Sequence, residues 1–170
     1  GQVVAGLADR DVAVRAAVRD VEAAREQFGG SVECVRFDFL RPETWGAAFE
    51  GVDAMFLVRP PSVSRVKRDL LPAVDAAVRV GVDHVVYLSV LGAEKNPLLP
   101  HHRVEDHLRA ADASYTFLRA SFFMQNLLEV HREDVVERDE IVVPAGSGTT
   151  SFVDARDVGA VAATVLSESG

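Results

Sequence analysis

The sequence predicts an α/β fold with a doubly wound, mostly parallel sheet. Short apolar runs alternate with helical segments along the whole chain, and this alternation is typical of βαβ units. Gly and Pro follow several of these runs, as expected where strands and helices end. The chain has no repeat, low-complexity segment or linker, so its 170 residues predict one domain with its own core.

Strands are expected where a run is short, apolar and rich in β-branched residues. The runs of this kind are residues 12–18, 32–37, 54–58, 84–89 and 115–119, with a shorter one near Ile141 to Val143. The third run is followed by Pro60-Pro61, which ends a paired strand. From residue 120 through Glu140 no period is evident, so we expect irregular structure there. A turn is expected at Gly146-Ser147-Gly148.

Helices are expected between the strands. They cover residues 2–8, 21–28, 42–50, a longer segment that ends at Val80, 101–111 and about 157–166. Gly29-Gly30 and Gly81 follow two of them as C-terminal stops, and Pro42 occupies a first turn. Pro72 either begins the regular part of its helix or bends it. In the last helix apolar residues recur at helical spacing, and Asp157 is the expected N-terminal cap.

Composition excludes several classes of function. A net charge of −8 and a pI near 5.1 argue against a nucleic-acid surface, which needs clustered Lys and Arg. No apolar run approaches the roughly 20 residues that cross a bilayer, and no signal peptide opens the chain. The single Cys34 excludes an internal disulfide and a cysteine-based zinc site. We therefore expect a soluble, cytoplasmic protein that binds neither nucleic acid nor membrane.

The stretch from Tyr115 to Asn126 carries the most functional information. It reads as a buried strand that runs directly into an apolar loop bearing side-chain amides. In an open α/β sheet, loops at the carboxyl ends of the strands form the walls of the ligand crevice. The stretch therefore predicts one wall of a binding site.

Three segments together resemble the NmrA-like branch of the atypical short-chain dehydrogenases. They are GVDHVVYLS (81–89), YTFLRASFFMQN (115–126) and SFVDARDV (151–158). The resemblance covers essentially the whole chain, although Ala120 stands where the family often has Pro. It implies a Rossmann fold that binds NADP(H) or NAD(H), in a family that includes quinone and dye reductases as well as redox-sensing regulators.

The resemblance also implies that residues 1–170 are one NAD(P)-binding domain truncated at both ends. Family chains open with a strand and a G-x-x-G-x-x-G loop, and Gly1 falls at or just after its third glycine. Family chains also continue past Leu166. Because the first strand lies at the centre of such a sheet, we expect a gap, or a partner segment, between the strands at 12–18 and 54–58. Continuous pairing of these two strands would contradict this expectation.

Five residues at or beside strand ends are candidates for binding the dinucleotide. Arg19 either binds the 2′-phosphate of NADP or is a solvated residue paired with Asp20, and the resemblance favours the first, so NADP(H) is preferred to NAD(H). Asp38 either accepts a hydrogen bond from the adenine amine or is a loop cap, and Phe39 beside it could lie on the adenine face. Arg59 either directs charge to a phosphate or points to solvent. Pro60 follows it, under the ribose and diphosphate.

Ser89 and His101 are the candidates for catalysis and for holding the nicotinamide ribose. Ser89 ends its strand where short-chain dehydrogenases place a catalytic Ser. The Tyr and Lys of those enzymes correspond here to Pro97 and His101, so the usual proton donor is missing. His101 and Glu105 share one helix face, and the resemblance implies that His101 holds the ribose while Glu105 orients it or caps nearby backbone. The other reading of His101 is a residue partly packed on the core.

The end of the Tyr115 to Asn126 stretch is the candidate substrate wall. We place Ser121 and Phe122 beside the cofactor, and Phe122, Phe123 and Asn126 at the substrate pocket, where aromatic side chains suit a flat acceptor. No metal site is expected. The resemblance implies an NADPH-dependent reductase of a small planar acceptor such as a quinone. The alternative is an inactive NADP(H)-sensing regulator, and a protein partner or a homo-oligomer is compatible with either.

Overall fold

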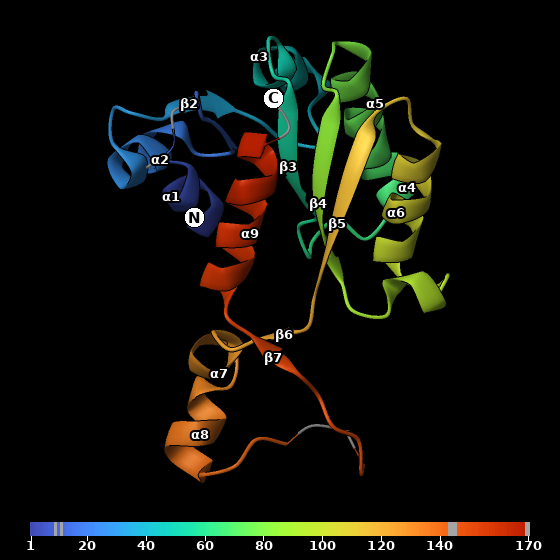
Figure 1. Cartoon of the computed structure of the whole chain (residues 1–170). Coiled ribbons are helices and arrows are strands. Elements are labelled where there is room, and N and C mark those ends of the chain that lie inside the picture. Colours follow the sequence, from blue (N-terminus) through green and yellow to red (C-terminus); the bar gives the residue numbers. More distant parts are fainter. Residues whose placement is uncertain (9, 11, 143–145, 169–170) are drawn as a thin grey trace.

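The computed structural model describes residues 1–8, 10, 12–142 and 146–168, which form parallel strands with helices packed around them (Figure 1). β3 (Ala54–Val58), β4 (His84–Val90) and β5 (Ser114–Ala120) form one sheet in the order β3-β4-β5, and both pairs are parallel. β1 (Arg15–Val18) and β2 (Glu33–Arg36) form a separate parallel pair. The predicted α/β fold with parallel strands is confirmed.

The helices follow the predicted alternation. They are α1 (Gln2–Ala8), α2 (Val21–Phe28), the 3-10 turn η1 (Pro42–Thr44) with α3 (Trp45–Phe49), α4 (Val66–Asp69), α5 (Leu71–Arg79), the 3-10 turn η2 (Ala93–Lys95), α6 (Pro100–Ala110), α7 (Asn126–Glu129), α8 (Arg132–Arg138) and α9 (Ala155–Glu168). The longer helix predicted to end at Val80 is two helices, because α4 stops at Asp69 and α5 begins afresh at Leu71. Pro72 lies in the first turn of α5, so it begins the regular part of that helix.

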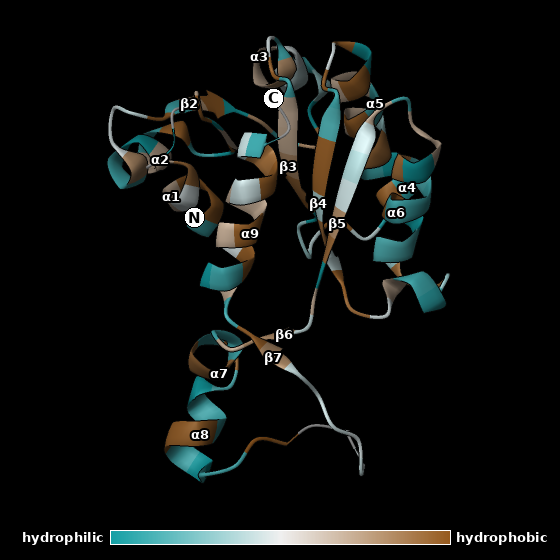
Figure 2. Ribbon diagram, viewed as in Figure 1, coloured by the Kyte–Doolittle hydropathy of each residue, from teal (hydrophilic) through white to brown (hydrophobic). Residues whose placement is uncertain are grey.

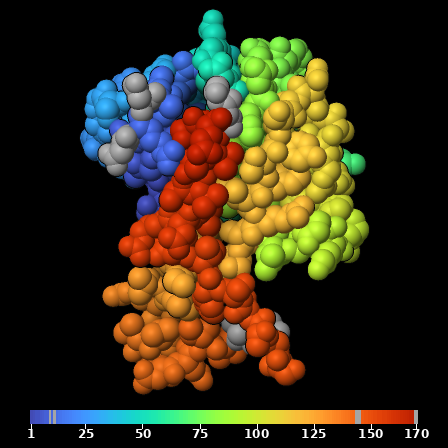
Figure 3. All heavy atoms as spheres, viewed as in Figure 1, coloured from blue at the N-terminus to red at the C-terminus, as the bar shows by residue number. Residues whose placement is uncertain are grey.

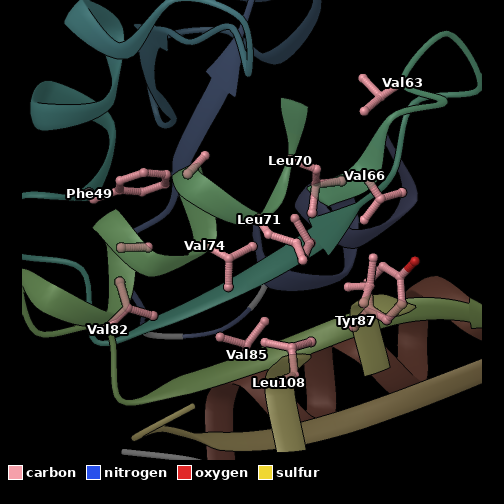
Figure 4. Close-up of a cluster of buried hydrophobic side chains, with 14 of the residues drawn as sticks. Phe49, Val63, Val66, Leu70, Leu71, Val74, Val82, Val85, Tyr87 and Leu108 are labelled. Carbon is pink, nitrogen blue, oxygen red and sulfur yellow. The ribbon is translucent and has the colours of Figure 1, made fainter. Parts of the chain in front are cut away.

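The main hydrophobic core lies between the β3–β4–β5 sheet and the helices α3, α5 and α6. Val85, Leu70 and Ala77 are fully buried in it, and Figure 4 shows side chains from the strands and helices converging there. Figure 2 shows hydrophobic colouring along β3 and much of β4, and hydrophilic colouring over most of α6. A second, smaller core joins β1 and β2 to α2. The two cores adjoin, because Val35 on β2 and Phe37 after it pack against the main one.

The two sheets are separated by a gap between β1 and β3. β3 pairs only with β4, and β1 pairs only with β2, among the residues that the structure describes. The prediction that these two strands do not pair with each other is confirmed. The gap leaves one edge of β3 without strand partners, and Val58, at the end of this wholly apolar strand, is 44% exposed. Figure 1 shows α9 standing between the β1–β2 pair and the larger sheet.

The segment from 120 to 142 differs from the irregular structure expected there. β6 (Phe122–Phe123) pairs in parallel with β7 (Phe152–Val153), and α7 and α8 follow β6. These elements are two to seven residues long, which is too short to leave a periodic signal in the sequence. Ile141 and Val142 have no regular secondary structure, so the strand predicted there is wrong for these two, and Val143 lies outside the described residues. Figure 3 shows this segment extending away from the main body.

The start of α9 lies two residues earlier than predicted. Asp154 precedes the helix, and its Oδ1 accepts hydrogen bonds from the Arg156 N–H at 2.7 Å and from the Gln125 amide at 2.8 Å. The Gln125 Oε1 accepts a bond from the Ala155 N–H at 3.0 Å. Asp154 and Gln125 therefore cap α9, and the prediction that Asp157 does so is wrong. The predicted turn at Gly146 is present, with Gly146 at a positive φ of 55°.

α1 and α9 cross at close range because glycines form the contact. A Cβ built on Gly159 would lie 2.6 Å from the Cβ and 3.0 Å from the carbonyl carbon of Gln2. A Cβ on Gly6 would lie 3.0 Å from the Cβ of Ala163. The missing side chains thus set the distance between the two helices. Among the described residues, no helix is both long and apolar enough to cross a membrane.

Replacing Gly159 by Ala is expected to destabilise the fold by about 1 to 3 kcal/mol, because the new methyl group overlaps Gln2 backbone and the helices must separate. The loss exceeds the gain of up to about 1 kcal/mol that Gly to Ala brings within a helix. Urea denaturation followed by circular dichroism measures the change. Gly46→Ala in α3 is the control, because its Cβ would meet nothing within 4 Å, and it should be neutral or stabilising. Equal effects of the two substitutions would contradict the close contact.

Candidate cofactor and substrate site

A large cavity lies between the two sheets. It has a volume of about 1200 Å³ and follows β1 and β3 along their unpaired edges. At the carboxyl ends of β1, β2 and β3 its wall contains Arg19, Asp38, Phe39 and Pro60. Parallel strands that end at one edge bring residues distant in sequence to a common crevice. The structure therefore gathers four of the predicted cofactor residues around one space.

Arg19 has no partner within the described part of the chain. Its side chain is exposed at the end of β1, on the cavity wall. The alternative reading paired it with Asp20, but Asp20 is the N-cap of α2 and its Oδ1 accepts a hydrogen bond from the Ala23 N–H at 3.1 Å. The need for a helix cap accounts for Asp20. The Arg19 guanidinium is thus available to an anion.

Asp38 is held in a tight turn that leaves part of its carboxylate available. Its Oδ1 accepts a hydrogen bond from the Leu40 N–H at 2.9 Å, and its backbone carbonyl accepts one from the Trp45 indole at 2.9 Å. Its Oδ2 has no hydrogen bond to any described residue. The Phe39 ring packs edge-on against Phe37 at 4.8 Å between centroids. The loop after β2 is therefore rigid at the cavity wall.

Arg59 folds back onto the loop that follows β3 and does not extend into solvent. Its Nη1 donates hydrogen bonds to the Pro60 carbonyl at 3.1 Å and the Val63 carbonyl at 2.9 Å. Its Nε is buried and has no hydrogen-bond partner among the described residues. In the described part of the chain no carboxylate forms an ion pair with Arg59, so its guanidinium places a positive charge at the carboxyl end of β3.

Glu105 is the centre of a buried network that includes Ser89. Its side chain is fully buried, and its carboxylate accepts hydrogen bonds from the Ser89 hydroxyl at 2.6 Å, from Arg119 at 3.0 and 2.7 Å, and from Arg109 at 2.8 Å. Burial alone would raise the pKa of Glu105, but the bonds from Arg119, Ser89 and Arg109 outweigh it and the pKa is lowered. The carboxylate therefore stays charged, and its partners come from β4, β5 and α6.

The hydroxyl of Ser89 is engaged in this network. Ser89 is 1% exposed, and its proton lies on the bond to Glu105. It lies outside the wall of the large cavity. Glu105 neither bonds to His101 nor caps backbone within the described residues, so the expectation that it orients His101 or caps the chain is wrong.

His101 instead bonds to Tyr87. The Tyr87 hydroxyl lies 3.0 Å from His101 Nδ1, and the two rings stack with centroids 5.9 Å apart. Burial raises the pKa of Tyr87 well above its ordinary value, so its hydroxyl stays protonated. Burial and the Arg59 charge lower the pKa of His101, while Glu105 acts in the opposite direction. His101 is therefore held as a neutral imidazole in the first turn of α6.

The residues predicted at the substrate wall lie beyond β5. Ser121 joins β5 to β6, and Phe122 and Phe123 form β6. The Phe122 ring contacts Phe152, with centroids 5.4 Å apart, and His131 at 5.9 Å. Asn126 begins α7. This group is separate from the wall that contains Arg19, so the predicted residues form two clusters at the same edge of the sheet.

Sequence reasoning missed Tyr87, Arg119 and His131. Tyr87 reads as one apolar residue of a buried strand, and its contact with His101 joins β4 to α6. Arg119 reads as a strand end, although two of its nitrogens bind Glu105. His131 lies in the segment expected to be irregular. One of these contacts had a signal in the sequence. Glu105 lies on an apolar helix face, and a buried carboxylate there requires a cationic partner such as Arg119.

Histidines outside these clusters are engaged in ordinary pairs. His102 lies 3.0 Å from Asp106, and His107 lies 2.6 Å from Asp75. Within the described residues, no group of three or more His, Cys, Asp and Glu side chains is arranged to hold a metal ion.

Comparison with known proteins identifies a family and two similar solved structures that contain a bound cofactor. The family model described as the NmrA-like family matches residues 1–169. An NAD(P)H azoreductase of Xenophilus azovorans is 33% identical over 175 residues, which cover 99% of this chain and 60% of that protein. The triphenylmethane reductase of Citrobacter sp., in complex with NADP(H), has a TM-score of 0.84 and 30% identity, over 100% of this chain and 62% of that one.

The NADPH-dependent quinone oxidoreductase QOR2 of Escherichia coli, in complex with NADPH, has a TM-score of 0.82 and 25% identity, over 99% of this chain and 61% of that one. Both solved structures hold the cofactor that the sequence analysis predicted. The chain spans about three fifths of the length of each of these three relatives.

Replacing Glu105 by Gln is expected to lower the free energy of unfolding at neutral pH by about 3 kcal/mol, because two guanidinium groups lose their carboxylate. The difference from wild type should shrink as the pH falls below 4.5, the ordinary pKa of a glutamic acid. A lowered pKa stabilises the fold above that value, and the stabilisation is lost as the folded carboxylate becomes protonated.

Urea denaturation over a series of pH values measures both effects. The control is Ser89→Ala, which removes one neutral donor, should cost about 1 kcal/mol and should keep the pH dependence. A difference between wild type and Glu105→Gln that is constant with pH would show that the carboxylate is not the titrating group.

Proposed function

The chain belongs to the NmrA-like family, and on this premise we propose that it is an NADPH-dependent reductase of a small planar acceptor such as a quinone. The observation that carries the proposal is the cavity of about 1200 Å³ whose wall unites Arg19, Asp38, Phe39 and Pro60 at the carboxyl edge of the strands. That edge is where open α/β sheets bind dinucleotides. NADP(H) is the preferred cofactor, and NAD(H) the second choice.

The residues on this wall fit the adenosine end of NADPH. Arg19 has no protein partner among the described residues, and a guanidinium fork matches the 2′-phosphate that distinguishes NADP from NAD. The Oδ2 of Asp38 is available to the adenine amine, and Phe39 lies beside it for the adenine face. Arg59 adds positive charge at the next strand end, where a diphosphate would pass.

The residues near β6 fit a flat acceptor. Phe122 and Phe123 offer aromatic surface, and Asn126 offers an amide at the start of α7. When bound, NADPH supplies a hydride. The chain has Pro97 where related dehydrogenases place a proton-donating Tyr, and Ser89 has its proton on Glu105. A quinone suits such a site, because the hydride reduces it and the proton that completes the hydroquinone comes from water.

We also propose that residues 1–170 belong to a single NAD(P)-binding domain whose sheet is completed by an extended segment between β1 and β3. The support is the cavity itself, which is lined along its length by apolar residues of β1 and β3 such as Ala16, Val18, Met55 and Leu57. A strand in this position would give β3 partners for its free backbone groups. It would also join the two sheets into one.

An NADP(H)-sensing regulator is the second candidate function. It is favoured by the bond from Ser89 to Glu105, which removes the Ser hydroxyl from chemistry while leaving the dinucleotide wall intact. Such a protein would bind NADP(H) without turnover and act through a protein partner or a homo-oligomer. For both candidates we propose a cytoplasmic location, consistent with the acidic charge and the single Cys34.

The reductase proposal predicts that the full gene product oxidises NADPH when quinones are added. A panel of quinones and dyes of similar size, with a simple ketone as the control substrate, is followed by NADPH absorbance. Quinones should accelerate oxidation and the ketone should not, because the ketone needs a proton donor that the site lacks. Binding of NADPH without acceleration by any acceptor would reject the reductase and support the sensor.

Arg19→Ala is expected to weaken NADPH binding by about 10-fold to 100-fold, the value of a charge-assisted hydrogen bond, and to leave NADH binding nearly unchanged. Isothermal titration with both cofactors measures the ratio. Arg79→Ala is the matched control, because Arg79 is also exposed but ends α5 at the opposite edge of the sheet. A parallel loss of affinity for NADH would show that Arg19 does not contact the 2′-phosphate.

A further inference from the structure

We propose that Tyr87 is the positioning residue of His101. Its hydroxyl fixes the imidazole as the neutral tautomer that carries its proton on Nε2. His101 then presents a hydrogen-bond donor to an oxygen of a ligand at the carboxyl edge of β3 and β4. The tautomer stands on the geometry of the chain alone, whereas the identity of the ligand, a ribose hydroxyl of NADPH, rests on the proposed function.

The hydrogen-bond inventory of Tyr87 determines the direction of the bond. Tyr87 is fully buried, and its hydroxyl has His101 Nδ1, at 3.0 Å, as its one hydrogen-bond partner among the described residues. If Nδ1 carried the proton, the buried hydroxyl would accept that bond and its own proton would have no acceptor. Leaving a buried donor unpaired costs about 1 to 3 kcal/mol. The hydroxyl therefore donates to Nδ1, and the imidazole proton resides on Nε2.

The charges around His101 keep the ring neutral. Arg59, held by the carbonyls of Pro60 and Val63, acts on His101 from the end of β3 and disfavours a second positive charge. Glu105 acts in the opposite sense from the next turn of α6. Its carboxylate is already neutralised by Arg119 and Arg109. The ring therefore remains a single donor and acceptor, which the directed bond from Tyr87 requires.

The surrounding core fixes where Tyr87 places its hydroxyl. Its ring packs within the main core and lies edge-on to Phe117, with centroids 6.5 Å apart. Figure 4 shows the hydroxyl directed away from the labelled side chains of Val85 and Leu108. Leu57 and Phe117 flank it in the strand register, so the ring cannot shift along β4. A rigid ring at this position holds the imidazole by stacking and by the hydrogen bond together.

The position of His101 indicates which kind of ligand its Nε2–H donor binds. α6 follows β4 and precedes β5, so its first turn lies at the carboxyl edge of the sheet. His101 is partly exposed in that turn, while Val104 one turn later is fully buried. The edge is shared with Arg59 and with the end of β3, which borders the large cavity. A donor fixed at this edge suits a neutral oxygen, and a ribose offers two.

Nitrogen-15 NMR of the histidine rings in the 170-residue chain tests the tautomer directly. In the wild type, His101 should show a protonated Nε2 and an unprotonated Nδ1 at neutral pH. In Tyr87→Phe, which keeps the ring in the core, His101 should shift to the mixture of tautomers of a free histidine, and its pKa should rise because the neutral form loses a donor. Tyr115→Phe is the control, since Tyr115 is exposed on β5 and its hydroxyl makes no hydrogen bond to any described residue.

Two results would overturn the proposal. One is a wild-type spectrum with the proton on Nδ1, which decides the matter even if Tyr87→Phe does not fold. The other is an Nε2 proton that persists unchanged in a folded Tyr87→Phe variant. Arg59→Gln supplies a second variant, in which the pKa of His101 should rise while the tautomer stays the same. None of these measurements depends on turnover, so they stand or fall separately from the reductase.

Kinetics of the full gene product then tests the ligand. Tyr87→Phe should raise KM for NADPH by about 2-fold to 10-fold, the value of one hydrogen bond, and leave kcat nearly unchanged, because ribose binding is the same in the ground and transition states. Tyr115→Phe should change neither constant. A fall in kcat at constant KM would mean that His101 serves the reacting atoms and not the ribose.

Discussion

The buried carboxylate of Glu105 is the interaction on which the arrangement of the larger sheet depends. It binds Ser89 on β4, Arg119 on β5 and Arg109 on its own helix, so one side chain ties α6 to two strands. A buried carboxylate without these partners would cost several kcal/mol. The same bonds fix the rotation of α6 about its axis. That rotation determines which residue of the first turn faces Tyr87, and the residue is His101.

The gap between β1 and β3 is the second constraint, and it explains the shape of the site. The two sheets do not pair with each other, and they are linked by α9, by the cavity between them and by contacts of β1 and β2 with the α3 region, such as the bond from Arg15 to the Glu50 carbonyl. The wall proposed for the adenosine therefore stands at the ends of β1 and β2, whereas Ser89 lies on β4 of the larger sheet, His101 on α6, and β6 in a separate pair with β7. The separation of the two predicted clusters follows from this division.

The main strands and helices could be predicted from the sequence, because a strand that is buried on both faces of its sheet appears as a continuous apolar run. All five main strands and most helices follow such runs, and the unpaired β1–β3 edge followed from the family pattern. The elements between Phe122 and Arg138 could not be predicted, because a two-residue strand and helices of four and seven residues are too short to show a period. Asp157 was chosen as a cap on local spacing, but the cap at Asp154 depends on Gln125, some thirty residues away.

The site was predicted least well where function depends on pairing across elements. Spacing on a helix placed Glu105 beside His101, since residues four apart share a face. The choice of partner was decided by charge, because a buried carboxylate is satisfied far better by two guanidinium groups than by a neutral imidazole. The Glu105 carboxylate therefore binds Arg119 and Arg109. The Tyr87 hydroxyl, which needs an acceptor, forms its hydrogen bond with the imidazole of His101. The result is a hydrogen-bond donor on His101 that is held in place at the carboxyl edge of β4 by Tyr87, while the carboxylate of Glu105 is fully engaged by its own partners.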